Sequence, residues 1–192
     1  MGSEMCIRDS FRIGPGTPQE GRTFEGQQFP ADAASWRNFI LGCVPRFTTT
    51  DDLTLAAYGA LLERVGPSVV VSHSQGGFFA WRAAQEWPGK VRALVLVEPA
   101  STGLAEKVAA LAGIPVLMIY GDFIAGDARW PAIRARGVAF AEAVRAAGGH
   151  VDVVDLPAQG ILGNSHMIQM DRNSDDVAAL VQEWLSARGL WT

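Results

Sequence analysis

The chain has 192 residues, of which 48% are hydrophobic and 19% charged, a composition that can bury a substantial core and predicts one globular domain. Its formal net charge of -4 provides no electrostatic attraction to nucleic acid or anionic lipid, so we expect the partner to be a small molecule. No apolar run reaches the roughly 18 residues of a membrane span, and no secretory signal pattern opens the chain, which predicts a soluble protein of unknown compartment.

The first thirty residues have no regular pattern. Residues 1–10, MGSEMCIRDS, show neither periodicity nor a helix cap, and we interpret them as a tag or artefactual leader before a domain that spans residues 11–192. The Gly- and Pro-rich stretch that follows predicts irregular chain, with regular structure beginning after Pro30. Cys6 and Cys43 lack the spacing of metal ligands and are expected to be free thiols.

Two helices are expected next. Residues 31–44 have a helical pattern, and residues 49–66 form a second helix with Thr50 as its N-cap and Gly66 beyond its last turn. The aspartate pair at positions 51 and 52 could suggest a metal site. No histidine or further carboxylate lies at ligand spacing, however, so favourable interaction with the helix dipole is the preferred explanation of this pair.

Strands and helices then alternate. Short apolar segments at residues 68–72, 91–97, 114–120 and 150–156 read as strands. The last helix covers residues 173–189, capped near Ser174 and ended by Gly189. Strands that alternate with helices imply right-handed crossovers, so we expect an α/β fold with a mostly parallel sheet and helices on both faces.

The sequence SHSQG at residues 72–76 turns the first predicted strand sharply into a helix. Side chains two positions before and two positions after the centre would collide, so small residues are needed there, and Ser72 and Gly76 meet this need. Gly77 lets the helix pack close to its neighbours. Ser74 is thus expected on a strained backbone at the carboxyl end of the sheet, above a helix N-terminus, where a nucleophile belongs.

A serine nucleophile needs a base and an acid that orients the base. His73 adjoins the serine and must point away from it, and His150 opens the last strand at the opposite edge of the sheet. His166, in the Gly-rich loop before the last helix, is therefore the predicted base. Two acids remain possible: Glu98 directly follows the second predicted strand, and Asp122 follows the third.

The strand, the S-x-S-x-G turn and the late loop histidine resemble an α/β-hydrolase. Over about residues 34 to 188, the segments SHSQGG, VEPA and GNSHMIQMDRNSDDVA resemble bacterial arylesterase-like esterases. In the wider fold the acid most often lies three residues past a glycine after the third predicted strand, which here is Ile124 and cannot serve. The esterase family places a glutamate after the second, so the resemblance implies Glu98 as the acid, with Asp122 as the alternative.

The chain also differs from this fold in the region before Ser74. An α/β-hydrolase has four or more strands before its nucleophile, and a loop among them provides one of two backbone N–H groups that bind the oxyanion. No such strand and loop precede Ser74, so we expect an N-terminally truncated domain that exposes one edge of strand 68–72. Gln75 is the expected oxyanion donor. Without a second donor, the chain is expected to be a poor catalyst.

The substrate pocket is expected to be apolar and open. Apolar side chains in loops at the catalytic end could line an acyl or aryl pocket: Phe123, Trp130, Ile161, Leu162 and Met167. The segment between Phe123 and Pro131 is too short for a large cap domain. A serine at position 74 also argues against a haloalkane dehalogenase, which needs an aspartate nucleophile.

The implied function is hydrolysis of a small carboxylic ester through an acyl-enzyme on Ser74, with His166 and Glu98 completing the triad and no metal or organic cofactor. Two alternatives stay open. One is a catalytically impaired fragment or ligand-binding relic with an incomplete oxyanion site. The other is lyase or acyl-transfer chemistry on the same triad, which fold analogy alone disfavours.

Overall fold

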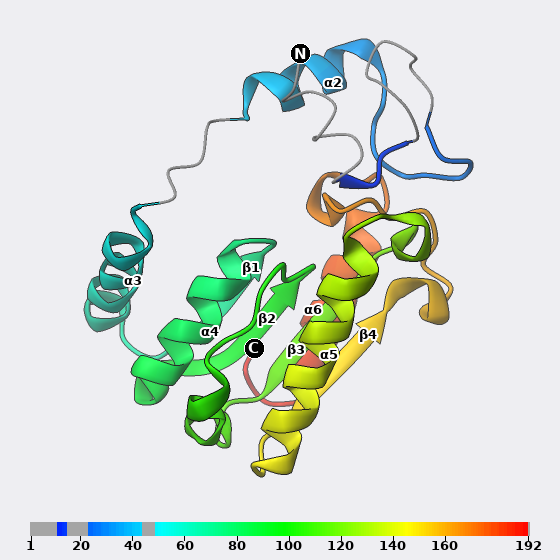
Figure 1. Ribbon diagram of the computed structural model, residues 1–192. Coiled ribbons are helices and arrows are strands. Elements are labelled where there is room, and N and C mark those ends of the chain that lie inside the picture. The colour runs from blue at the N-terminus through cyan, green and yellow to red at the C-terminus, as the bar shows by residue number, and fades with distance from the viewer. Residues whose placement is uncertain (1–10, 15–22, 44–48, 192) are drawn as a thin grey trace.

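The computed structural model describes residues 11–14, 23–43 and 49–191 (Figure 1). Its centre is a four-stranded parallel sheet in which the strands follow one another in chain order: β1 (Ser68–His73), β2 (Val91–Val97), β3 (Val116–Tyr120) and β4 (Val151–Asp155). The four predicted strands are confirmed with ends that differ by no more than two residues. The predicted leader, residues 1–10, lies outside the described residues.

Helices cover both faces of the sheet, as predicted. One face packs against α3 (Asp51–Val65), α4 (Gly76–Glu86) and α5 (Trp130–Ala146), and the other packs against α6 (Ser174–Ser186). Neighbouring residues of β2 show the division, because Leu94 belongs to the first core and Val95 to the second, and both are fully buried. Such burial on two sides explains why the central strands read as continuous apolar runs.

A smaller third core lies beyond the carboxyl ends of the strands. It joins the short segment 11–14 to α2 (Ala33–Leu41) through Ile13, Phe29 and Phe39. α2 begins two residues later than predicted, because the Asp32 carboxylate accepts a hydrogen bond from Ser35 N at 3.0 Å and caps the helix. The irregular stretch before Pro30 therefore contributes buried side chains to the region above the sheet.

The edge strand β1 agrees with the sequence-based expectation, whereas the last helix, α6, ends earlier than predicted. Within the described part of the chain β1 pairs with β2 alone, and Val71 of β1 is 62% exposed. α6 has Asn173 as its N-cap and ends at Ser186, three residues before the predicted end at Gly189. No helix among the described residues is both long enough and apolar enough to cross a bilayer.

Candidate active site

Ser74 lies in the tight turn between β1 and α4. Its φ angle is +53°, in the left-handed region that side chains other than glycine seldom adopt. Hydrogen bonds hold the residue there: Ser74 N donates to Val97 O at 3.0 Å, and Ser74 O accepts from Gly77 N at 3.1 Å and from Ala100 N at 3.0 Å. The turn therefore presents the serine hydroxyl at the carboxyl end of the sheet.

The small residues of this turn are needed for the reasons that the sequence indicated. A Cβ atom on Gly76 would lie 3.5 Å from Ser72 Cβ, so only small side chains can face each other there. A Cβ atom on Gly77 would lie 2.9 Å from Pro99 Cβ, closer than carbon atoms can approach. The absence of a side chain at Gly77 thus lets α4 pack against the segment that follows β2.

Gly77→Ala is expected to destabilise the fold, because the added methyl group must displace α4 or Pro99. Overpacking of this kind costs about 1–3 kcal/mol of the free energy of unfolding. Gly76→Ala is the matched control, since its new methyl group makes an ordinary contact with Ser72 and should cost less than about 1 kcal/mol. Urea unfolding followed by circular dichroism measures both, and equal stability of the two variants would contradict the packing argument.

Ser74 forms a hydrogen-bonded chain with two residues that are distant in sequence. His166 Nε2 lies 2.8 Å from Ser74 Oγ, and His166 Nδ1 lies 3.2 Å from Glu98 Oε2. The side chains of His166 and Glu98 are both buried. These are the predicted base and the acid that the resemblance implied, and they stand in the order that activates a serine.

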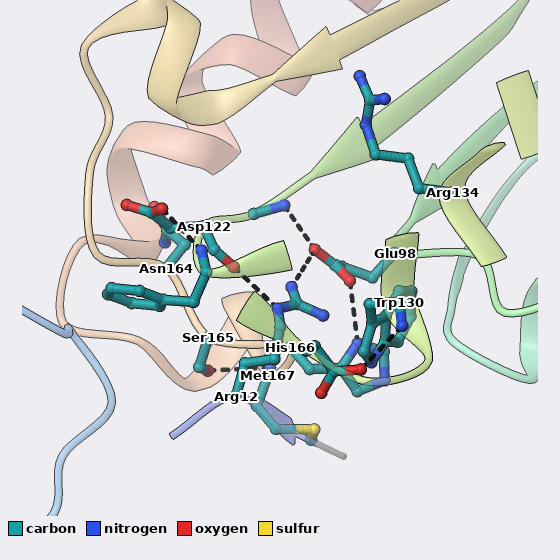
Figure 2. Close-up of polar contacts among 12 residues, drawn as sticks. Arg12, Glu98, Asp122, Trp130, Arg134, Asn164, Ser165, His166 and Met167 are labelled. Carbon is teal, nitrogen blue, oxygen red and sulfur yellow. Dashed lines mark hydrogen bonds and ion pairs between the residues drawn. The ribbon is translucent and has the colours of Figure 1, made fainter. Parts of the chain in front are cut away.

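The Glu98 carboxylate is fully enclosed and has charged and polar neighbours on both oxygens (Figure 2). Glu98 Oε1 accepts hydrogen bonds from Arg12 Nη2 at 2.6 Å and from Gly121 N at 2.5 Å. Burial favours the neutral acid, but the hydrogen bond with His166 and the charge of Arg12 outweigh it and hold the pKa of Glu98 below its usual value. Glu98 is therefore ionised at neutral pH.

His166 is a neutral imidazole at neutral pH. Burial lowers the pKa of His166 below the ordinary value for histidine, although the hydrogen bond with Glu98 acts in the opposite direction. The ring packs between aromatic neighbours, with centroids 5.4 Å from Phe11 and 4.5 Å from Trp130. A neutral ring with Nδ1 directed at a carboxylate can accept a proton at Nε2.

The loop that carries His166 is fixed by a second buried carboxylate. Asp171 accepts hydrogen bonds from Ser165 N at 2.8 Å, Ser165 Oγ at 2.7 Å and Asn164 Nδ2 at 3.1 Å. Burial raises the pKa of Asp171 despite these hydrogen bonds. His166 N also donates to Phe11 O at 2.8 Å. The Gly-Asn-Ser-His sequence thus forms a rigid support for the imidazole.

The other candidates from the sequence make different contacts. The Asp122 carboxylate accepts hydrogen bonds from Phe123 N at 2.7 Å and Gly163 N at 3.0 Å, so it orders the turn after β3. His73 Nε2 lies 2.7 Å from the His166 carbonyl oxygen, and burial lowers the pKa of His73 to about 4. His150 immediately precedes β4, and its carbonyl accepts a hydrogen bond from Val116 N.

Arg12 is the site residue that sequence reasoning missed. It stands in the segment FRIGPG, where no periodicity or motif distinguishes it from a solvent-exposed arginine. In the structure its side chain is 1% exposed, and Arg12 Nε donates to Asp122 O at 2.8 Å while Nη2 binds Glu98. No signal in the local sequence could have found this contact, because it joins residues 86 positions apart.

A cavity of about 740 Å³ opens beside Ser74. It is bounded by the turn, by α4 and by the exposed face of α5, and its lining includes Gln75, Phe78, Ser101, Ala132, Ile133 and Arg136. Asp51, at the start of α3, also lines this cavity. Gln75 is thus placed beside the nucleophile, where its backbone N–H could bind an oxyanion.

The five residues predicted for the pocket do not line this cavity, although Phe123 and Met167 line two other cavities. Trp130 is buried against the His166 ring, Met167 packs on the third core, and Ile161 packs on the α6 side of the sheet. Phe123 stacks on Phe24 at 4.7 Å, and Leu162 is 58% exposed. The cavity is bordered by residues of α4 and α5 instead.

Neither cysteine nor carboxylate clusters suggest a metal centre in the described residues. Cys43 is a free, exposed thiol, whereas Cys6 lies outside the described part of the chain. No group of three or more histidine, cysteine, aspartate or glutamate side chains with metal-binding geometry occurs in residues 11–14, 23–43 and 49–191.

Comparisons with known proteins find similarity to a lipase and to an esterase. No protein-family model matches the sequence. A curated protein, the probable secreted lipase phiG of Fungal sp. (strain ATCC 74256), is 27% identical in an alignment that covers 71% of this chain and 50% of the lipase. A novel bacterial esterase of solved structure is 34% identical, with a TM-score of 0.86, over 94% of this chain and 56% of that chain. The chain therefore spans about half the length of both proteins.

Proposed function

As this chain is a member of the α/β-hydrolase superfamily, we propose that it is the part of a serine hydrolase that cleaves carboxylic esters through an acyl-enzyme. One observation carries the proposal. Ser74 Oγ, on a strained turn at the edge of a cavity, is joined through His166 to the buried carboxylate of Glu98 by contacts of 2.8 and 3.2 Å. The two similar proteins are named as a lipase and an esterase, and both names denote ester hydrolysis, which supports the proposal.

In the first half of the proposed reaction, Ser74 Oγ attacks the ester carbonyl carbon while His166 Nε2 removes the hydroxyl proton. Glu98 Oε2 accepts a hydrogen bond from Nδ1–H and stabilises the imidazolium that forms. The negative charge on the carbonyl oxygen is bound by Gln75 N–H at the positive end of α4. His166 then gives its proton to the departing alcohol, which leaves an acyl group on Ser74.

In the second half, His166 removes a proton from water, and the hydroxide oxygen attacks the acyl carbonyl carbon. The tetrahedral intermediate breaks down to the carboxylic acid as His166 returns the proton to Ser74 Oγ. Water must reach the acyl-enzyme for this step, and the cavity beside Ser74 gives it access. Because water can reach the acyl-enzyme through this cavity, hydrolysis is the simplest fate of the acyl group.

The decisive experiment is labelling of the 192-residue chain with a serine-directed fluorophosphonate, followed by mass spectrometry of the peptides. We expect one adduct, on Ser74, because His166 Nε2 lies 2.8 Å from its hydroxyl oxygen and can remove the proton. Ser101→Ala is the matched control, since Ser101 lines the same cavity and should not be needed. Absence of any adduct would favour the ligand-binding relic, and an adduct that persists in Ser74→Ala would overturn the assignment of the nucleophile.

A further inference from the structure

We propose that Arg12 is a positioning residue of this site, whose guanidinium group fixes the orientation and charge of Glu98 so that one carboxylate oxygen is always directed at His166. The inference rests on the proposed function, because the effect on turnover requires that Glu98 act through His166. It adds a residue from the first described segment of the chain to a triad whose members come from the loops after β1, β2 and β4.

The two oxygens of Glu98 have different neighbours. Oε1 accepts from Arg12 Nη2 at 2.6 Å and from Gly121 N at 2.5 Å, and Oε2 lies 3.2 Å from His166 Nδ1 (Figure 2). The first oxygen is therefore an anchor, and the second is left for the imidazole. Rotation of the carboxylate would break both anchoring contacts, so the arrangement selects one orientation.

Arg12 is itself held in place on several sides. Its Nε donates to Asp122 O at 2.8 Å, and its guanidinium carbon lies 4.7 Å from the centre of the Trp130 ring. Trp130 in turn packs against the ring of His166. A side chain with these contacts is preorganised, and the planar fork of arginine suits the simultaneous binding of a carboxylate and a carbonyl oxygen better than lysine would.

Because both side chains are buried, Glu98 needs the positive charge of Arg12 to stay ionised. Glu98 is 0% exposed, and a carboxylate in such a place takes up a proton unless a positive charge compensates it. The arginine guanidinium group retains its proton at every working pH. Arg12 therefore keeps Glu98 ionised where solvent cannot.

The backbone supports the same cluster. Of the residues that the structure describes, the non-glycine residues with positive φ are Arg12 (+51°), Ser74 (+53°), Glu98 (+48°) and Phe123 (+58°). The first three belong to the site, and the fourth follows the carbonyl group to which Arg12 Nε is bound. Backbone strain of this kind persists where surrounding contacts enforce it and gathers at functional sites.

Removal of Arg12 has a predictable electrostatic effect. The charged and titratable groups that act on His166 are Glu98, Arg12 and Asp127, and the His73 ring lies beside it. When the positive charge of Arg12 is lost, the Glu98–His166 pair takes up its first proton at a higher pH, whichever of the two residues holds it. Since that proton disables the base, the acid limb of the kcat/KM profile must move to higher pH.

The test compares Arg12→Met, Arg12→Lys and Arg188→Met with the unmodified chain, using p-nitrophenyl acetate from pH 4 to 9. Arg188 is a close match on the surface: it binds Asp152 at 2.6 Å, lies 4.1 Å from the Trp184 ring and donates to Trp184 O at 3.1 Å. For the unmodified chain we expect an acid limb below about pH 6.5, because the pKa of His166 is lowered.

For Arg12→Met we expect the acid limb to rise by about one pH unit or more. We also expect kcat on the plateau to fall about 10- to 100-fold, the effect that loss of a residue orienting a metal ligand has in metalloenzymes, with KM nearly unchanged. Arg12→Lys should keep the acid limb close to its original pH and recover only part of kcat. Arg188→Met should behave as the unmodified chain.

A folded Arg12→Met variant with an unchanged acid limb and unchanged kcat would overturn the proposal. If that variant does not fold, Arg12→Lys decides, because full activity with lysine would show that the fork geometry is not needed. Carbon-13 NMR titration of the Glu98 carboxyl and His166 ring gives the same comparison without turnover. An unmodified chain with no Ser74-dependent hydrolysis would refute the proposed function, whereas unchanged NMR titration in Arg12→Met would refute the role of Arg12.

Discussion

Ser74→Ala is expected to lower kcat for p-nitrophenyl acetate to near the rate of the uncatalysed reaction. The reason is that alanine has no oxygen at the position 2.8 Å from His166 Nε2, so no acyl-enzyme can form. Substrate should still bind, because the cavity lining is otherwise unchanged. Turnover is measured by release of p-nitrophenolate and compared with that of the unmodified chain at equal concentration.

The fold should tolerate this substitution. Alanine and serine are of similar size, and the lost hydrogen bond to His166 is worth about 1 kcal/mol, which changes Tm by roughly 2–4 °C in a chain of this length. Ser101→Ala provides the comparison within the same cavity and should retain its activity. Turnover by a correctly folded Ser74→Ala variant at the original rate would remove the serine from the mechanism.

Glu98→Gln is expected to lower kcat by about 10⁴-fold, the usual effect of replacing the acid of a triad by its amide. An amide cannot stabilise the imidazolium, and it can present an NH₂ group to His166 Nδ1 in place of an acceptor. In that orientation the amide oxygen keeps its contacts with Arg12 Nη2 and Gly121 N, whereas the opposite orientation would place the NH₂ group against these two donors.

Asp122→Asn is the matched substitution, and it should lower kcat by less than about tenfold, far short of the loss of a triad acid. Its carboxylate accepts from Phe123 N and Gly163 N, so the amide disturbs one of these turn contacts and leaves the His166 contacts intact. Circular dichroism and Tm of both variants control for folding. The opposite order of kcat values would transfer the acid role to Asp122.

The predictable part of the site is the part encoded by local pattern. Apolar runs of strand length gave the four strands, and the small residues around Ser74 gave the turn, because each depends on neighbours close in sequence. The choice of His166 followed from the position of its loop. The residues alone left Glu98 and Asp122 open, and the resemblance implied Glu98, which the structure brings into contact with His166.

The rest depended on tertiary packing. A buried charge such as Arg12 is indistinguishable in sequence from an exposed one, since its burial is set by residues that arrive from β2 and from the start of α5. The cavity beside Ser74 depends on tertiary packing in the same way. Of the apolar residues predicted to line a pocket, Trp130 packs against the His166 ring, and residues of α4 and α5 border the cavity.

The long span of the site in the chain has a consequence for refolding. The contacts of Glu98 and His166 join residues separated by 86, 68 and 92 positions, and that of Arg12 with Asp122 joins residues 110 apart. Contacts between such distant positions form late, because loop closure must precede them. During refolding from urea, helical circular dichroism should therefore return before reactivity at Ser74, so that the rate of fluorophosphonate labelling becomes a measure of how much of the population has completed its fold.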